Sequence, residues 1–380
     1  MKQRLDGLAV FRELLKDGAV AAFRELLQDC CRNDADNFVS HCGEFESLLF
    51  QQSDCWTAYL RRAVMESENV CIRNWASGAV TAVQEECLNR ELVFLDRLSQ
   101  VTLDDLTAGL DHAPDFLVGW RTEGGSIAQD YRQRMQEVGE KGYGIFARYH
   151  MFTVENGQLV PVKHPDPQQL KQLPGYEQER QKVIANTQAL LDGKPANNVL
   201  LYGDAGTGKS SAIKAIANNF AEQGLRLVEV KKNQLYQIPD LMDQLAANPL
   251  RFILFIDDLS FSSNDDNFAA LKAILEGSVG GRARNIAVYA TSNRRHLIKE
   301  TLTDRTGDDI HEADTRQELM SLSARFGLTV TFQRPEKARF ETILEELAKQ
   351  HHVDMPMDQL LVKAEAFAIR AGGRSPRVAK

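Results

Sequence analysis

Apolar residues recur at helical spacing through residues 1–115. The string Phe11-Arg-Glu-Leu-Leu15 returns as Phe23-Arg-Glu-Leu-Leu27, and further amphipathic stretches occupy 56–60 and 91–98. Apolar positions three and four residues apart share one face of a helix, and Leu, Phe and Trp on such a face are typical of a core. The pattern predicts an all-helical N-terminal domain over residues 1–120.

A different pattern covers residues 121–170, which we expect to be a connector with a β-hairpin. The stretch 123–142 is polar and favours one exposed helix, and two apolar runs follow at 151–155 and 158–162. Asn156-Gly157 separates these runs, and Asn-Gly fits the type I′ turn that joins two paired strands. The sequence therefore predicts a short hairpin before the next domain.

Strand and helix patterns alternate over residues 171–333. A helix is predicted over 176–191, and apolar runs typical of buried strands follow at 198–202, 252–256, 285–290 and 328–332. Strands that alternate with helices along the chain pair in parallel and are covered by helices on both faces. The sequence therefore predicts an α/β domain in this region.

Residues 334–380 show helical patterns over 335–351 and 357–370. Beyond them, Ser375 followed by Pro376 marks another helix start, because a serine hydroxyl accepts from free backbone N–H groups and proline fits the first helical position. The chain ends at Lys380, and so few residues cannot stabilise a helical turn alone. We expect a small helical lid that is truncated within its last helix.

Composition excludes some function classes and leaves others open. Of the 380 residues 43% are apolar and 26% are charged, as in ordinary globular proteins, and the net charge is −8. An acidic chain has no general attraction for nucleic acid or anionic membranes. No apolar run approaches the about 18 residues of a membrane helix. We expect a cytoplasmic protein without membrane association.

The cysteines do not form a recognisable metal or disulfide pattern. No two have the C-x-x-C spacing, and His41 beside Cys42 is the only candidate pair, which cannot close a tetrahedral zinc site. We expect reduced thiols packed as small apolar side chains. All six lie in the first quarter of the chain: Cys30, Cys31, Cys42, Cys55, Cys71 and Cys87.

Residues 203–210 read Gly-Asp-Ala-Gly-Thr-Gly-Lys-Ser, between a predicted strand and a predicted helix. Glycines let backbone N–H groups turn inward around phosphates, a lysine reaches the β- and γ-phosphates, and a serine hydroxyl ligates Mg²⁺. The segment predicts binding of ATP with Mg²⁺, with Ser210 on the metal. The predicted phosphate-binding residues are Gly203, Asp204, Ala205, Gly206, Thr207, Gly208, Lys209, Ser210 and Ser211.

Polar residues follow two of the later apolar runs. Asp257 and Asp258 end the run at 252–256, and Asn293 ends the run that begins at 285. We expect Asp257 to hold Mg²⁺, mainly through water, and Asp258 to activate the attacking water. An aspartate reaches one methylene less than the usual glutamate, which predicts slow hydrolysis or a need for closure by a neighbour. The Asn293 amide can accept from water and donate to a γ-phosphate.

Two arginines complete the candidate catalytic set. Arg325 stands just before the last predicted strand, where it could reach the nucleotide of an adjacent subunit and act in trans. Arg377 follows the helix start at Ser375 and could swing toward the γ-phosphate. For each, the alternative is a solvated surface arginine.

Together these motifs resemble the AAA+ superfamily. A strand tipped by Asn293 and lying between the strands at 198–202 and 252–256 would be the sensor-1 arrangement of AAA+ ATPases, although chain order leaves its place in the sheet open. The pairing of Ala324-Arg-Phe-Gly327 with Ser375-Pro-Arg-Val378 is similar to RuvB-type branch-migration motors.

Longer strings at 197–203, 256–261 and 289–296 resemble the bacterial ATP-binding proteins of domain-of-unknown-function family 815. The resemblance covers about residues 150–380. It implies ATPase chemistry on a P-loop AAA+ core with a parallel five-stranded sheet and a small helical lid, here preceded by an all-α N-terminal domain and a short β-hairpin.

Three functions remain open at this point. The first is a homo-oligomeric ring that couples ATP hydrolysis to remodelling of an unidentified protein partner, which the N-terminal helices recruit. The second is a DNA-directed loader or initiator, less favoured because the chain is acidic and has no recognisable DNA-reading motif. Its phosphate-contacting strip would be Arg282, Arg284, Arg294 and Arg295. The third, supported by Asp258, is an ATP-gated switch with little hydrolysis.

Overall fold

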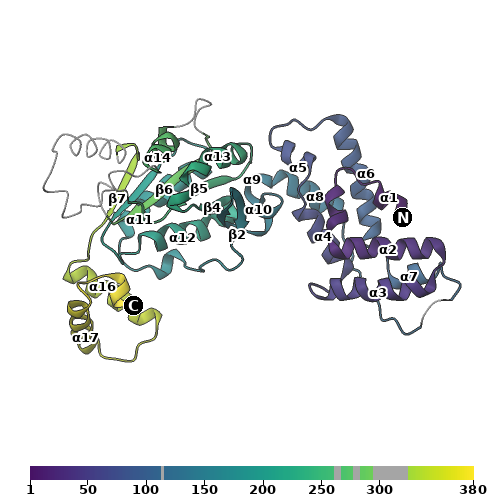
Figure 1. Ribbon diagram of the computed structural model, residues 1–380. Coiled ribbons are helices and arrows are strands. Elements are labelled where there is room, and N and C mark those ends of the chain that lie inside the picture. The colour runs from purple at the N-terminus through teal and green to yellow at the C-terminus, as the bar shows by residue number, and fades with distance from the viewer. Residues whose placement is uncertain (113–114, 261–266, 277–282, 294–323) are drawn as a thin grey trace. The chain divides into compact units, whose positions relative to one another are not determined.

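The computed structural model describes residues 1–112, 115–260, 267–276, 283–293 and 324–380. It contains two compact units, Met1–Arg148 and Tyr149–Lys380 (Figure 1). The region 121–170 is divided between them, so that its helix belongs to the first unit and its hairpin to the second. Within the described ranges, no helix is both long and apolar enough to cross a membrane.

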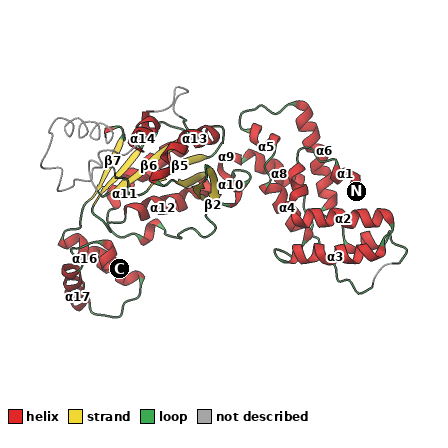
Figure 2. Cartoon of the chain, in the orientation of Figure 1, coloured by secondary structure: helices red, strands yellow, loops and turns green. Residues whose placement is uncertain are grey.

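Helices build the first unit, as the spacing of apolar residues predicted (Figure 2). The pair α2 and α3 pack side by side, and α6 packs against α8. The elements are α1 (Lys2–Asp6), η1 (Arg12–Lys16), α2 (Gly18–Arg32), α3 (Ala35–Phe50), α4 (Trp56–Glu66), α5 (Val70–Trp75), α6 (Ala82–Leu98), α7 (Leu103–Thr107), α8 (Ile127–Gln136), α9 (Val138–Lys141) and α10 (Ile145–Arg148).

Aromatic rings fill the centre of the first unit. Phe23 stacks on Trp56 with ring centroids 4.7 Å apart, and Phe45 meets Trp56 and Trp120 edge to face. Each indole also finds an acceptor: Trp56 Nε1 donates to the Leu98 carbonyl at 3.0 Å and Trp120 Nε1 to the Val101 carbonyl at 2.9 Å. Because the polar N–H is satisfied, both large rings can be buried.

The helix predicted in the polar stretch 123–142 is half-buried, so the expectation of an exposed helix was wrong. On α8, Ile127, Tyr131 and Met135 are buried, and Asn69 Nδ2 donates to the Tyr131 hydroxyl at 2.7 Å. These apolar residues lie four apart on one face. The many Gln, Arg and Glu residues around them hide that stripe when composition alone is considered.

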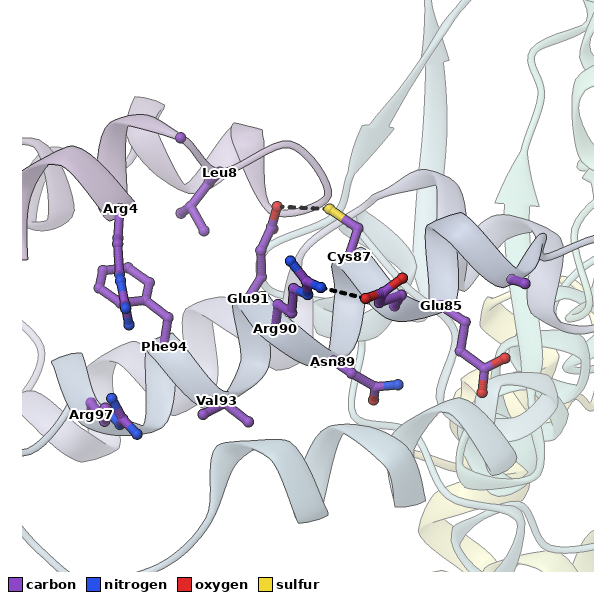
Figure 3. A pocket seen from close by; sticks show the side chains of 13 residues that line it. Arg4, Leu8, Glu85, Cys87, Asn89, Arg90, Glu91, Val93, Phe94 and Arg97 are labelled. Carbon is purple, nitrogen blue, oxygen red and sulfur yellow. Dashed lines mark hydrogen bonds and ion pairs between the residues drawn. The ribbon is translucent and has the colours of Figure 1, made fainter.

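A cavity of about 970 Å³ opens in the first unit between the N-terminal segment and α6 (Figure 3). Arg4, Leu8 and Phe94 are among the residues that line it. Glu91, buried at its side, accepts from three successive backbone N–H groups, those of residues 9, 10 and 11, at 2.6, 3.1 and 2.9 Å. Cys87 Sγ donates to the same carboxylate at 3.4 Å.

A seven-stranded sheet organises the second unit, in the order β2-β1-β4-β5-β6-β3-β7. Strands β4, β5, β6, β3 and β7 are parallel, as expected. The strands are β1 (Met151–Glu155), β2 (Gln158–Pro161), β3 (Val199–Gly203), β4 (Leu225–Glu229), β5 (Arg251–Ile256), β6 (Ile286–Ser292) and β7 (Leu328–Phe332).

The predicted hairpin forms and also extends this sheet. Strands β1 and β2 pair across the Asn156-Gly157 turn, and β1 pairs in parallel with β4 from Met151 opposite Leu227. The sheet therefore has seven strands and not the expected five. The physical reason is the edge of β4, whose backbone groups would otherwise have no strand partner on that side.

Helices cover both faces of the sheet (Figure 1). On one face α11 (Glu177–Leu191) and α12 (Lys209–Phe220) join a core with alternate strand residues such as Val199 and Leu201, while α13 (Ile238–Ala246) and α14 (Asn267–Glu276) lie on the other. Strands buried on both faces need near-continuous apolar runs. Short 3₁₀ helices connect the layers: η2 (Leu170–Gln172), η3 (Ala221–Gln223) and η4 (Lys232–Gln237).

The C-terminal helices α16 (Lys337–Gln350), α17 (Met357–Arg370) and α18 (Pro376–Ala379) form the predicted lid. Ser375 Oγ accepts from the Val378 N–H at 3.3 Å, which confirms the predicted helix start. Ile343 and Leu347 of α16 belong to the same buried cluster as the sheet residues. The lid is thus packed onto the sheet domain.

Candidate functional site

The predicted phosphate-binding segment forms the turn from β3 into α12. Gly203, Gly206 and Gly208 have φ angles of 139°, 77° and 90°, which favour glycine. A Cβ on Gly203 would lie 2.1 Å from the Phe332 carbonyl oxygen, so no larger residue fits there. Thr207 Oγ1 closes the turn by donating to the Asp204 carbonyl at 2.9 Å. The turn ends at the N-terminus of α12, where free backbone N–H groups favour an anion.

Lys209 is buried and makes three hydrogen bonds through Nζ. It donates to the carbonyls of Gly203 and Asp204 at 2.8 Å each and to Asn293 Oδ1 at 3.0 Å. Burial lowers the pKa of this amine, and the carboxylates of the neighbouring aspartates oppose that shift. Three acceptors match the three donors of an ammonium group. Phosphate oxygens that bind here would replace some of the three acceptors that Lys209 Nζ already has.

Ser210 and Asp257, the predicted metal ligands, lie in contact at the carboxyl edge of the sheet. Ser210 Oγ donates to Asp257 Oδ1 at 2.6 Å. Thr291, at the end of β6, donates to the same oxygen at 2.5 Å and accepts from the Asp258 N–H at 2.9 Å. A hydroxyl beside a carboxylate is a set of hard oxygen donors that suits Mg²⁺. Sequence reasoning missed Thr291, because nothing local distinguishes it from other strand threonines.

Asn293 joins the lysine to the second aspartate. Strand β6 lies between β3 and β5, which confirms the place that the asparagine-tipped strand was expected to take. Asn293 Nδ2 donates to Asp258 Oδ1 at 3.0 Å, while its oxygen accepts from Lys209. Asp258 has a φ of 51°, a left-handed conformation that is uncommon outside glycine. Such conformations are concentrated at functional sites.

Arg377 lies on the lid helix α18, against the P-loop turn. Its backbone N–H donates to the Gly206 carbonyl at 3.2 Å. A Cβ on Gly206 would come within 3.2 Å of the Arg377 Cβ. Burial is the main cause of the lowered pKa of Lys209, and the nearby charge of Arg377 adds to it. The predicted arginine and the predicted phosphate site are therefore adjacent.

Arg325 lies at the other end of the sheet from its own P-loop. It is half-buried three residues before β7, and β7 pairs with β3 in parallel from Leu328 opposite Val199 to Phe332 opposite Gly203. Four residues of strand span about 13 Å. Arg325 therefore stands apart from the cluster that Lys209 and Asn293 form within one chain.

A cavity of about 580 Å³ lies beside the P-loop and was not predicted from the sequence. Asn218 on α12 holds its outer wall, because Nδ2 donates to the carbonyls of Asp166 and Gln168 at 2.9 and 2.8 Å. This wall is a turn-rich segment without a recognisable motif. Lining residues include Gly206, Gly208 and Ser211 from the P-loop side, Pro174 from the wall, and His351 and Arg377 from the lid.

Other predicted features stand outside this cluster. Ala205 is exposed at the tip of the P-loop. Of the four arginines of the alternative DNA strip, Arg284 is exposed just before β6, whereas Arg282, Arg294 and Arg295 lie outside the described residues. The six cysteines are free thiols, and burial raises the pKa of Cys30 to about 11 and of Cys42 to about 12.

Parts of this chain are similar to known proteins. The family model described as "Protein of unknown function (DUF815)" matches residues 146–380, more than half of the chain. The AAA-ATPase At4g30250 of Arabidopsis thaliana is 29% identical over 176 residues, which cover 43% of this chain. The match spans 31% of that relative, less than a third of its length.

Solved structures with partial similarity include the Thermotoga maritima RuvB Holliday junction branch migration motor. It is 15% identical, with 56% of this chain and 70% of that chain covered and a TM-score of 0.34. A lysine-to-arginine mutant of the same motor is 17% identical, with 56% and 62% covered and a TM-score of 0.37. The chain belongs to the family described as "Protein of unknown function (DUF815)".

Proposed function

We propose that this protein hydrolyses ATP with Mg²⁺ at the carboxyl edge of its sheet and uses the cycle to remodel a partner protein. One observation carries the proposal. Lys209, Asn293 and Asp258 form a hydrogen-bonded row beside the Ser210–Asp257 pair. A charge for the phosphates, an amide for water and a carboxylate for a proton therefore lie within one cluster.

In this proposal, residues 203–211 bind the triphosphate through the backbone of the turn, and Lys209 contacts the β- and γ-phosphates. Ser210 and Asp257 hold Mg²⁺, which when bound would offset negative charge on the phosphate oxygens. The 580 Å³ cavity beside the turn takes the nucleoside, with the lid over it. Arg377, against Gly206, then meets the γ-phosphate from the lid side.

Asp258 and Asn293 act on the attacking water. The water oxygen bonds to the γ-phosphorus, the bond to the bridging oxygen breaks so that ADP leaves, and the water proton passes to Asp258. Asn293 is engaged by both Lys209 and Asp258 before ATP arrives. When the γ-phosphate takes its place at Lys209, the amide loses one of these partners and becomes able to orient water.

Arg325 supports a site shared between copies of the chain. It stands at the far end of the sheet from its own P-loop, so its guanidinium is better placed for a neighbour's nucleotide than for its own. Head-to-tail contacts of this kind close into rings when the rotation allows. We assign partner recruitment to the N-terminal helical unit, which precedes the family match at 146–380.

Phosphate release under multiple turnover tests the proposal. Asp258→Asn should retain ATP binding and lose turnover by about 10²-fold or more, because it removes the proton acceptor. Asp243→Asn, an exposed aspartate on α13, is the matched control and should hydrolyse normally.

A wild-type chain that binds ATP but releases phosphate for one turnover only would favour the ATP-gated switch. The bond from Asn293 to Asp258 is the observation behind that second candidate, since it restrains the carboxylate. Unchanged turnover in Asp258→Asn would remove this residue from catalysis.

A further inference from the structure

We propose that Arg334 is a positioning residue that transmits the state of the P-loop to the lid through Asp204. The inference rests on the proposed function, because it needs a nucleotide at Lys209. Arg334 follows β7 directly and precedes the lid helix α16. No sequence motif singles it out. Its contacts reach the P-loop on one side and the lid on the other.

Asp204 is the junction on the P-loop side. Its backbone carbonyl accepts from Lys209 Nζ at 2.8 Å, and its N–H donates to the Phe332 carbonyl at 3.2 Å. Its carboxylate accepts from the Arg334 N–H at 3.0 Å and lies 3.4 Å from Arg334 Nε. One residue therefore contacts both the phosphate-binding lysine and the chain that leads to the lid.

The guanidinium of Arg334 continues the connection. Nη1 donates to the Gly372 carbonyl at 2.7 Å. A Cβ on Gly373 would lie 2.5 Å from the same nitrogen, and φ is 83° at Gly372 and 134° at Gly373, so this approach requires glycine. These glycines join α17 to α18, whose Arg377 bonds back to Gly206. The contacts therefore run from the P-loop through Arg334 to the lid, and from the lid through Arg377 back to the P-loop.

The residue before Arg334 is fixed to the sheet. The Tyr176 hydroxyl donates to the Gln333 carbonyl at 2.5 Å, and the Tyr176 ring stacks on Phe332 with centroids 5.2 Å apart. Gln333 is therefore tied to Tyr176, at the start of α11. Arg334 is the next residue along the chain, and it contacts both the P-loop and the lid.

The solvent exposure of the Arg334–Asp204 ion pair favours a positioning role over a role in folding stability. The side chains of Arg334 and Asp204 are 58% and 43% exposed. Exposed ion pairs contribute little to folding stability. Removing Arg334 should therefore leave the fold intact and change the link between ATP state and lid. When phosphates draw Lys209 away from the Asp204 carbonyl, the freed turn would shift Asp204, and Arg334 would carry that shift to Gly372.

Hydrogen exchange of the full chain tests the proposal, with saturating ADP or a non-hydrolysable ATP analogue and Mg²⁺. In the wild type, peptides covering 371–380 should exchange at least about fivefold more slowly with the ATP analogue than with ADP, a modest coupling. Arg334→Met should abolish this difference and weaken nucleotide binding by less than about fivefold, because the ion pair is exposed. Asp204→Asn should reduce the difference, and the double variant should add nothing to Arg334→Met.

Arg370→Met is the matched control. Arg370 is an exposed arginine of the lid helix α17, and its Nε donates to the Ala366 carbonyl of the same helix at 3.3 Å. It should retain the ATP–ADP difference. The proposal is overturned if Arg334→Met also retains that difference, or if the wild type has none. Because the analogue is not hydrolysed, these outcomes are independent of whether the chain turns over ATP.

Discussion

Two cavities in the described part of this chain have neighbouring polar side chains that are bonded in opposite ways. Beside the larger one, in the first unit (Figure 3), Glu91 accepts from three successive backbone N–H groups, so its bonds hold the chain that forms the cavity wall. Near the smaller one, which P-loop residues line, Asn293 bonds within the described part of the chain to the side chains of Lys209 and Asp258. Phosphate oxygens can replace the partners of the Lys209 and Asn293 side chains without unfolding anything, whereas release of Glu91 would leave three backbone N–H groups without their acceptor.

This difference indicates which cavity lies at the reactive site. Volume alone would select the first unit, at about 970 Å³ against about 580 Å³. Charged groups with exchangeable partners converge at Lys209, next to the P-loop residues that line the second cavity, and functional sites concentrate such groups. This selects the second cavity. The experiments below test whether polar groups of the first unit serve folding and those of the second serve the ligand.

The largest effect is expected at Lys209. Lys209→Ala should weaken ATP binding by about 10³-fold, or about 4 kcal/mol, because the ammonium makes two charge-assisted contacts to phosphates. Titration with a fluorescent ATP analogue measures it. Lys182→Ala, an exposed lysine on α11, should bind normally. Thermal unfolding of the Lys209 variant should stay close to the wild type. Normal ATP affinity in Lys209→Ala would contradict the assignment of Lys209 to the phosphates.

At Glu91 we expect a smaller effect, and it should fall on the stability of the first unit and not on ATP binding. Glu91→Ala leaves three backbone N–H groups without their acceptor, two of them buried, and should destabilise the first unit by about 3 kcal/mol, while ATP affinity stays unchanged. Trp56, Trp75 and Trp120 are the three tryptophans of the chain and all lie in this unit, so tryptophan fluorescence during denaturation reports on it alone.

Glu91→Gln keeps one acceptor oxygen and should fall between the wild type and the alanine variant. Glu85→Ala removes an exposed carboxylate of the same helix and is the control. Loss of ATP binding in Glu91→Ala without loss of stability would break the comparison, since Glu91 would then be serving a ligand.

Much of the second unit could be predicted because its chemistry is local. The P-loop glycines, the strand that ends in Asp257 and the serine–proline start of α18 are each defined by neighbours in sequence, and each stands where expected. Asn156-Gly157 likewise predicted the hairpin.

What escaped prediction depends on partners distant in sequence. The pairing of β1 with β4 joins segments more than seventy residues apart, so turn chemistry could not show that the hairpin extends the sheet. Thr291 and Arg334 gain their roles only from what tertiary folding brings beside them. A threonine in a strand and an arginine in a linker carry no signal of their own.

The smallest effect concerns a titratable pair in the first unit. His41 Nδ1 lies 2.6 Å from Asp29 Oδ2, and this hydrogen bond raises the pKa of His41 above its ordinary value of 6.5, while burial opposes the shift. A raised pKa means that the folded state favours the protonated imidazole. The stabilisation is therefore complete below pH 6.5 and is lost as the pH rises through the raised value.

Tryptophan-detected unfolding at pH 6 and pH 8 should accordingly show a first unit that is less stable at pH 8, by at most about 1 kcal/mol because the pair is partly exposed. His41→Gln should flatten this dependence and leave ATP binding unchanged at both pH values. If His41→Gln instead altered the pH dependence of ATP binding, a titratable group of the first unit would be acting on the ligand. That result would contradict the comparison, in which polar groups of the first unit serve folding and those of the second serve the ligand.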